Sequence, residues 1–324
     1  PTHITPMAMG KQPLESSTQY TNSLQAILAD QLMRNRQHFW RRLPGGNRVS
    51  MGLCRRLALY CPEFCSRQLH DPIFVVGFNN GGKSRLVSLL EKELVACTYP
   101  DEGNAEFWFR GYFPWAEKRP DFGPIWSDPD KFISKILPMH SDSFMRSRAY
   151  LGAYQWLMGT QNIINDSGML GAISPDMFSS FPNAKFVHVI RDGRVASYLS
   201  AKREWCNIMR IPEVYQSRNC PIKFQDVLSK MINYWAWTVN RVQSIKAIAP
   251  DKVYEIRYEE WCKDPTQIFH ELVSFMGIES KSSTDLSKLN LTNMNQLIHE
   301  EFTLQDLTTM SESAGKTLAQ LGYI

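Results

Sequence analysis

The sequence predicts an α/β protein, a three-layer P-loop-type fold with a central parallel sheet flanked by helices and with an N-terminal helical extension. Two observations lead to this prediction. A glycine-rich segment joins an apolar, strand-like run to a helical pattern near residue 80. From residue 71 onward, short apolar runs alternate with helical stretches. Such alternation is typical of a parallel sheet whose two faces are both covered by helices.

The predicted strands are short apolar runs separated by helical segments. They are residues 73–76, 95–98, 162–165, 186–190 and 253–257. Residues 100–130 are rich in Pro, Gly, Trp and Phe, and we expect a long excursion over the carboxyl edge of the sheet there. Loops at that edge are the usual place for substrate contacts.

The N-terminal part of the chain has a different pattern. Residues 1–13 carry three prolines and little periodicity, whereas 16–42 places apolar side chains along one helical face. A Pro-Gly-Gly break follows, and a second helix is expected over 51–69. We therefore divide the chain into an N-terminal helical extension (1–70) and a main α/β domain (71–324).

Composition sets broad limits on function. The 324 residues are 43% hydrophobic and 21% charged, with a net charge of +4, which is ordinary for a globular protein and gives no reason to expect nucleic acid as a partner. We expect no membrane segment, because no run of eighteen apolar residues occurs. The seven cysteines show no metal-type spacing, so we expect no metal site and a reduced, cytoplasmic compartment.

The glycine-rich segment is the most informative motif. Residues 77–84 read Gly-Phe-Asn-Asn-Gly-Gly-Lys-Ser and fit the pattern G-x-x-x-x-G-K-[ST]. In such a loop, backbone N–H groups, the N-terminus of the following helix and the lysine Lys83 surround phosphate groups. The alternative is a surface turn rich in Asn and Gly. We favour a phosphate-binding loop, because a strand and a helix are both expected beside it.

A second anion site is expected where the strand 186–190 ends. An NTP-dependent kinase would need an acidic residue there to hold magnesium. The strand ends instead in Arg191, and serines Ser197 and Ser200 follow on the next helix. An arginine can clamp a phosphate with two hydrogen bonds, and a hydroxyl on the first helical turns can add a donor.

Three segments in this order resemble the sulfotransferases that use 3′-phosphoadenosine 5′-phosphosulfate (PAPS). Residues 181–194 read FPNAKFVHVIRDGR, residues 257–265 read RYEEWCKDP, and residues 314–323 carry AGK and LGY at their ends. The resemblance covers roughly residues 71–324. It implies a sulfotransferase with PAPS as the donor and PAP, adenosine 3′,5′-bisphosphate, as the product.

The resemblance also implies which residues bind the nucleotide. The loop would hold the 5′-phosphosulfate, Arg191 the 3′-phosphate, and Tyr258 would lie beside the adenine. The family serine lies eight residues after the arginine, where this chain has Leu199, so Ser197 and Ser200 both remain candidates. The expected nucleotide-binding residues are Asn79, Asn80, Gly81, Gly82, Lys83, Ser84, Arg85, Arg191, Ser197, Ser200 and Tyr258.

The sequence departs from the family at two catalytic positions. Asn80 stands where the family usually has Lys or Arg, and Asn165-Asp166 replaces its Lys-Thr segment. We therefore assign the catalytic cation to Lys83. The general base is expected to be Glu106, because other branches of the family place a glutamate in that segment. The alternatives for the base are Asp101, Glu102 and His140.

The predicted reaction is transfer of a sulfuryl group to a hydroxyl or nitrogen of a small-molecule, natural-product-like acceptor, without magnesium. Aromatic and acidic residues interleave in 101–126, which would suit a cationic or guanidinium acceptor. Two alternatives remain open, namely an ATP-dependent small-molecule kinase and a catalytically silent nucleotide-binding protein. The sequence does not determine the oligomeric state.

Overall fold

A computed structural model describes residues 46–98, 123–139, 142–166, 170–217, 220–221, 223–281 and 291–324 of this chain. Within these residues, five strands form one parallel sheet in the order β2-β3-β1-β4-β5. The strands are β1 (Ile73–Gly77), β2 (Cys97–Thr98), β3 (Ile163–Asp166), β4 (Lys185–Ile190) and β5 (Val253–Arg257). The predicted α/β class with a central parallel sheet is confirmed.

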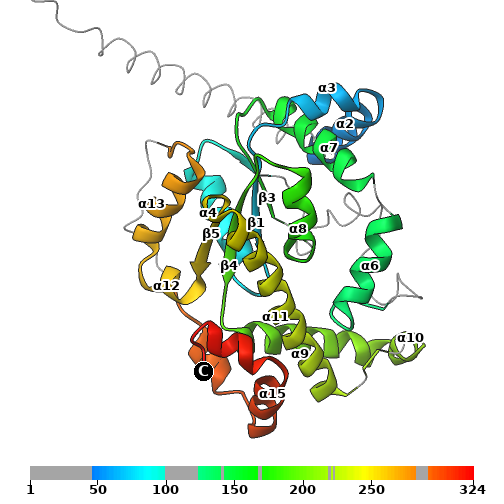
Figure 1. The fold of residues 1–324 in the computed structure, drawn as a ribbon, viewed down its shortest axis with the longest axis vertical. Coiled ribbons are helices and arrows are strands. Elements are labelled where there is room, and N and C mark those ends of the chain that lie inside the picture. The colour runs from blue at the N-terminus through cyan, green and yellow to red at the C-terminus, as the bar shows by residue number, and fades with distance from the viewer. Residues whose placement is uncertain are drawn as a thin grey trace, which may run out of the picture.

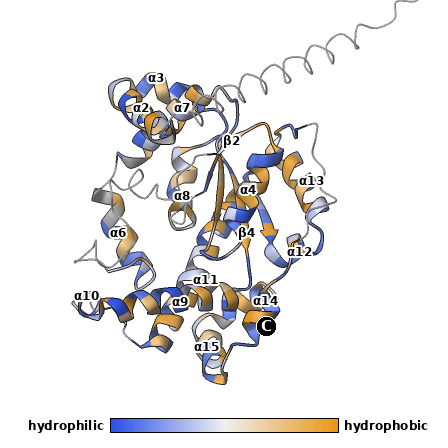
Figure 2. Ribbon diagram, turned by 180° about the vertical axis from the view of Figure 1, so that it is seen from behind, coloured by the Kyte–Doolittle hydropathy of each residue, from blue (hydrophilic) through white to orange (hydrophobic). Residues whose placement is uncertain are grey.

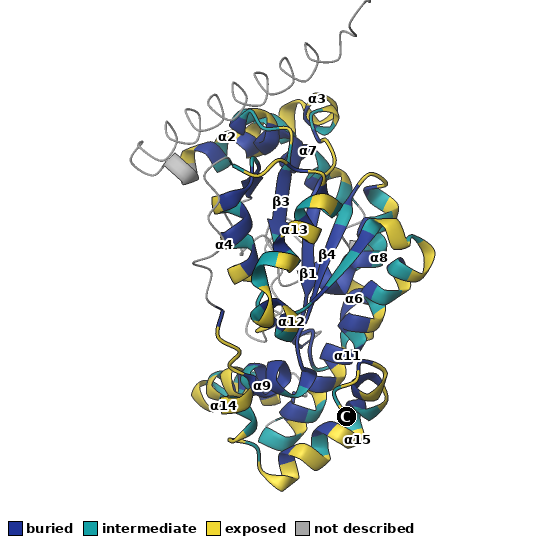
Figure 3. Ribbon diagram, turned by 90° about the vertical axis from the view of Figure 1, so that its left-hand side faces the viewer, coloured by how far each residue is buried: buried dark blue, intermediate teal, exposed yellow. Residues whose placement is uncertain are grey.

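Four of the five strands nearly coincide with their predicted ranges, and β2 is shorter. The backbone N–H of Val95 donates to Glu279 O at 3.0 Å, and Leu94 forms an isolated antiparallel bridge with Ser280. Residues 94 and 95 therefore bond outside the sheet, so only Cys97 and Thr98 pair with β3. All five residues of β1 are buried, as expected for a central strand covered on both faces. In Figure 3, β1, β3 and β4 are dark blue.

Helices cover both faces of the sheet (Figure 1). One face packs against α4 (Lys83–Glu93), α12 (Tyr258–Lys263) and α13 (Pro265–Met276), and Figure 2 shows α4 and α13 on this side. The other face packs against α8 (Leu170–Ser180), α9 (Gly193–Arg210) and α11 (Phe224–Ile248). Further helical segments are α6 (Pro129–Met139), α7 (Ser143–Met158), α10 (Pro212–Gln216), α14 (Asn295–His299), α15 (Leu304–Gln320) and the short η2 (Pro250–Lys252).

The single helix predicted over 51–69 is wrong, because two helices occupy this region. They are α2 (Gly46–Tyr60) and α3 (Pro62–Arg67). Pro62 has no backbone N–H to continue α2 and instead begins α3 at its first position. Both helices pack against α7 at one end of the molecule, whereas α9 and α15 lie at the other end (Figure 1). The helix predicted over 16–42 lies outside the described residues.

Small residues let three helices approach closely next to the glycine-rich loop 77–84. A Cβ on Gly193 would lie 2.5 Å from the Trp235 ring, and one on Gly171 would lie 2.7 Å from Thr238 Cγ2. Real Cβ contacts are longer than this, so α9 and α8 can only take these positions against α11 with glycine. The N-terminal ends of α8 and α9 therefore lie close to α11 at the carboxyl ends of β1 and β4.

The C-terminal part returns to the carboxyl edge of the sheet. Helix α15 begins with a capping box, in which Thr303 Oγ1 accepts from the Asp306 N–H while Asp306 accepts from the Thr303 N–H. Its buried residues Met310 and Leu318 belong to the core that also includes α11. The short helix α14 precedes it and lies against α9.

Candidate functional site

The loop between β1 and α4 has the backbone shape that its glycines predict. Gly77 has φ +140°, Asn80 +58° and Gly82 +99°, and glycine and asparagine tolerate such positive values best. A Cβ on Gly77 would lie 2.4 Å from Val189 O. The loop therefore lies tightly against β4, and α4 begins directly after it, so that backbone N–H groups gather at the turn.

Lys83 lies at the start of α4 and is largely buried, with 7% of its surface exposed. Its Nζ donates to Phe78 O at 3.3 Å across the loop. The ammonium group is thus held at the loop that would surround a phosphate. The next two predicted residues, Ser84 and Arg85, are exposed on the first turn of α4, and Asn79 is half-buried in the loop.

Arg191 follows β4 and reaches the same loop. It is 8% exposed, and its Nη1 donates to Asn80 O at 2.9 Å. Its Nε donates to Asn295 Oδ1 at 2.8 Å, and its guanidinium carbon lies 4.4 Å from the centre of the Tyr258 ring. Three contacts from three separate segments therefore fix the guanidinium plane.

The two candidate serines have different surroundings. Ser200 Oγ accepts from Asn80 Nδ2 at 2.8 Å and donates to Ala196 O. Ser197 is fully buried, and its Oγ has no hydrogen-bond partner among the described residues. A buried hydroxyl without a partner is uncommon in a folded protein. Ser200 is therefore bonded within the protein, whereas the Ser197 hydroxyl is enclosed and has no bond among the described residues.

Tyr258 is 5% exposed and closes one side of the loop. A Cβ on Gly82 would lie 2.9 Å from its ring, and its hydroxyl donates to Thr292 O at 3.2 Å. Burial raises the pKa of this phenol above its usual value, so it is a neutral hydrogen-bond donor at pH 7. The ring face next to Arg191 is already occupied by the guanidinium group.

Sequence reasoning missed the residues that surround Arg191 and Asp192 from the C-terminal part of the chain. Asn295 Nδ2 donates to Glu259 Oε1 at 2.6 Å, and His299 Nε2 lies 3.0 Å from Asp192 Oδ2. Glu259 also accepts from the Asp192 N–H. Glu259 lies next to Tyr258 in the RYEEW segment and was open to inference, but Asn295 and His299 belong to no recognisable motif.

The end of β3 lies beside β1, since Val75 pairs in register with Asp166. Asn165 is 1% exposed, and neither of its amide atoms has a hydrogen-bond partner in the described part of the chain. The predicted base Glu106 and its alternatives Asp101, Glu102 and His140 lie outside the described residues. The structure therefore brings together the loop, Arg191, Ser200 and Tyr258, and the described residues give no position for the base.

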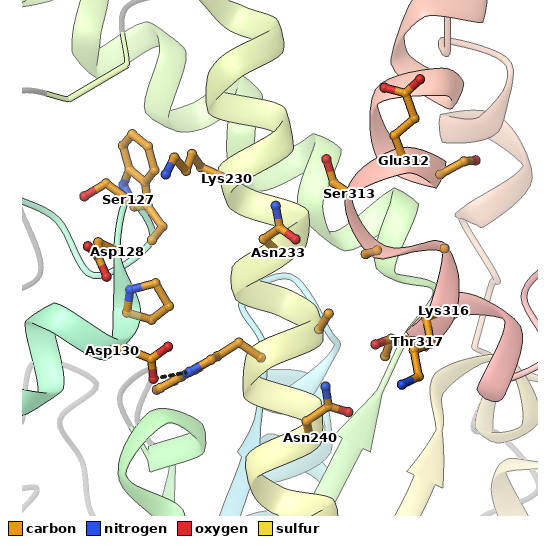
Figure 4. Close-up of a pocket in the computed structure, with 17 residues that line it drawn as sticks. Ser127, Asp128, Asp130, Lys230, Asn233, Asn240, Glu312, Ser313, Lys316 and Thr317 are labelled. Atoms are coloured by element: carbon orange, nitrogen blue, oxygen red, sulfur yellow. Dashed lines mark hydrogen bonds between the residues drawn. The ribbon is translucent and has the colours of Figure 1, made fainter.

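A separate pocket of about 710 Å³ lies on the outer face of α11. Figure 4 shows Lys230, Asn233 and Asn240 of α11 facing it, with residues of α15 on one side and Ser127, Asp128 and Asp130 on the other. Tyr234, which packs against Phe78 of the loop, lies next to Trp237 of the pocket wall, with 6.0 Å between the ring centres. The predicted nucleotide-binding residues that the structure describes do not line this pocket.

These features define a glycine-rich loop between a strand and a helix of a parallel α/β sheet, with a buried arginine at the end of the neighbouring strand β4. Residues 171–282 match the sequence model of a family described as the sulfotransferase family. The match spans less than half of the chain and confirms the resemblance to sulfotransferases over these residues. It includes Arg191, both candidate serines and Tyr258. A search among curated proteins found no match to this chain.

Several solved sulfotransferases have a similar structure. One from Alicyclobacillus acidocaldarius is 19% identical, with a TM-score of 0.45 over 75% of this chain and 95% of its own. STF1 from Mycobacterium tuberculosis is 12% identical, with a TM-score of 0.47 over 84% and 82%. STF9 from Mycobacterium avium is 13% identical, with a TM-score of 0.49 over 87% of both chains.

Over the ranges that the structure describes, no helix combines the length and the apolar composition that crossing a lipid bilayer requires.

Proposed function

We propose that this protein is a PAPS-dependent sulfotransferase that transfers a sulfuryl group to a hydroxyl or nitrogen of a small-molecule acceptor. The observation that carries the proposal is the buried Arg191, whose guanidinium bonds to the phosphate-binding loop through Asn80 O. Two anion-binding elements thus lie side by side. PAPS has phosphate groups on both sides of its ribose, whereas a nucleoside triphosphate needs one cradle and a magnesium ligand.

The residues present fit such a donor. The loop and the start of α4 offer backbone N–H groups and Lys83 to a 5′-phosphosulfate. Arg191 offers donors to a 3′-phosphate, and Ser197 and Ser200 remain our candidates for the serine that would add a further donor. In this assignment Tyr258 orients Arg191 through its ring face and borders the adenine with its remaining edge. Ser200 acts through Asn80, to which it is bonded.

Lys83 has the central catalytic role in the proposed reaction. An oxygen or nitrogen of the acceptor forms a bond to sulfur while the bond from sulfur to the 5′-phosphate oxygen breaks. Negative charge grows on that phosphate oxygen, and the ammonium of Lys83 stabilises it. The acceptor proton passes to a general base, for which Glu106 remains our proposal with Asp101, Glu102 and His140 as alternatives. The products are the sulfated acceptor and PAP.

Calorimetry with PAP and with Mg·ATP tests the donor. We expect PAP to bind without magnesium, and Arg191→Ala to weaken PAP binding by about tenfold or more, since hydrogen bonds to charged groups contribute about 1.5–3 kcal/mol. Tight binding of Mg·ATP with none of PAP would instead support the small-molecule kinase.

Activity is tested with radiolabelled PAPS and a panel of acceptors that includes amines, guanidines, phenols and alcohols. We expect a labelled product, and we expect Lys83→Met to lower turnover about 100-fold or more, as for loss of a group that stabilises transition-state charge. Binding of PAP without any labelled product would support the silent nucleotide-binding protein. A cationic acceptor would fit the acidic and aromatic residues of 101–126, and the panel separates it from neutral ones.

A further inference from the structure

The C-terminal part of the chain takes part in holding Arg191. Asn295 opens α14, lies 104 residues beyond Arg191 and is 8% exposed. Its Oδ1 accepts the Nε–H of Arg191 at 2.8 Å. This bond occupies the Nε side of the guanidinium, so a ligand approaching Arg191 meets the two Nη groups.

The orientation of the Asn295 amide is fixed by a second residue. Its Nδ2 donates to Glu259 Oε1 at 2.6 Å, and the same oxygen accepts the Asp192 N–H at 2.9 Å. Tyr323, next to the last residue of the chain, donates to Glu259 Oε2 at 3.1 Å. An inverted amide would direct an NH₂ group at Arg191 and an oxygen at the carboxylate, and both contacts would be repulsive. Glu259 therefore keeps the acceptor oxygen of Asn295 facing Arg191.

Arg191 has five N–H groups. Within the described part of the chain, one is bonded to Asn295 and one to Asn80 O, while Tyr258 supports one face of the guanidinium. The remaining N–H groups of Nη1 and Nη2 can bind two oxygens of one phosphate. A free arginine side chain would lose rotational freedom on binding, whereas this one is already ordered.

We propose that Asn295, held by Glu259, is a positioning residue that presents the Nη groups of Arg191 to the 3′-phosphate of the donor. This inference rests on the proposed function, and it makes residues 291–324 part of the selection for 3′-phosphorylated nucleotides. Asn295 bonds to Arg191, so under this proposal its loss should affect only nucleotides that carry the 3′-phosphate.

The test compares PAP with AMP, which differ only in the 3′-phosphate, on the full chain by calorimetry. We expect Asn295→Ala to raise the Kd of PAP about tenfold, as for one lost hydrogen bond to a charged group, and to leave the Kd of AMP unchanged. Gln296→Ala is the matched control, because it removes an exposed amide from the same helix; it should change neither constant. If Asn295→Ala raised the Kd of PAP and of AMP by the same factor, the role of Asn295 would be merely structural and the proposal would be overturned.

Glu259 provides a second, independent pair of variants. Glu259→Gln keeps an oxygen that can accept from Asp192 and Asn295, and its NH₂ can face the Tyr323 hydroxyl, so the preference for PAP over AMP should stay near that of the wild type. Glu259→Ala should lose most of the preference for PAP over AMP. An equal preference in both variants would contradict the proposal, and this pair decides the question if Asn295→Ala does not fold.

Failure of this inference is distinguishable from failure of the proposed function. If the wild type binds PAP no more tightly than AMP, the proposed 3′-phosphate site is wrong. If the wild type prefers PAP and Arg191→Ala abolishes the preference while Asn295→Ala retains it, only the role of Asn295 is overturned.

Discussion

Asn80 both shapes the turn of the loop and bonds to two residues outside it. Its backbone has φ +58°. Its backbone carbonyl accepts from Arg191, and its side-chain amide donates to Ser200. The sequence led us to regard Asn80 as the loss of a catalytic cation. The contacts give it a different role, as the residue that joins the glycine-rich loop to Arg191 and to helix α9.

Replacement of Asn80 by Gly and by Ala separates these tasks. Both variants lose the side-chain bond to Ser200, and both should bind PAP more weakly to the same extent. Only alanine is strained at a positive φ, so Asn80→Ala should be less stable than Asn80→Gly by roughly 0.5–1 kcal/mol, after allowing for the greater freedom of glycine in the unfolded chain. Urea unfolding measures this difference. Equal stability of the two variants would mean that the backbone at residue 80 is not strained.

Sequence reasoning located correctly the elements whose signal is local spacing in the chain. The loop and the strand end before Arg191 were predicted because an apolar run and a glycine or an arginine lie next to each other in the chain. Asn295 could not be predicted, because only the folded chain brings it to Arg191. At Pro62 the signal was local, since proline favours the first position of a helix. It was overlooked, and one helix was predicted where there are two.

At the scale of secondary-structure elements, β4, β5 and α11 are linked by a buried polar group. His188 on β4 is fully buried, and its Nδ1 lies 3.2 Å from Glu255 Oε1 on β5. Glu255 also pairs with Lys246 of α11. Burial lowers the pKa of His188, so the imidazole is neutral at pH 7 and donates to the carboxylate. For Glu255, burial alone would raise the pKa, but the bonds from His188 and Lys246 outweigh it and lower the pKa to about 2.

This group predicts a specific acid sensitivity. A carboxyl whose folded pKa is about 2 against an ordinary value of 4.5 stabilises the fold above about pH 4.5, and this contribution is lost as the pH falls toward 2. Glu255→Gln should therefore differ most from the wild type at pH 7, and the two should converge between pH 4.5 and 2. Urea unfolding at several pH values measures the difference. A difference that stays constant over this range would contradict the assignment.

At the scale of the whole molecule, the candidate site joins three segments that are far apart in sequence. They are the loop 78–84, the strand end and helix start 191–200, and the C-terminal 291–299. The bonds among Asn80, Arg191 and Asn295 connect all three. The alternating apolar runs predicted the strands and a parallel sheet but not the strand order, and this three-way junction depends on where the C-terminal segment returns.

Hydrogen–deuterium exchange tests whether the three segments respond as a unit. We expect PAP to slow exchange in all three, because a ligand that bonds to both the loop and Arg191 stabilises the contacts that join them. AMP should slow exchange in the loop alone. Protection by PAP that is confined to the loop would mean that the second phosphate does not reach Arg191.

The bond between Arg191 Nη1 and Asn80 O has a further consequence. The guanidinium proposed to bind the 3′-phosphate is bonded to the loop proposed to bind the 5′-phosphate. The distance between the two proposed phosphate sites is therefore set by the protein. Arg191 and the loop should then select nucleotides by the distance between their two phosphates. Adenosine 2′,5′-bisphosphate has the same charge and composition as PAP but a different distance between its phosphates. We therefore expect it to bind more weakly than PAP.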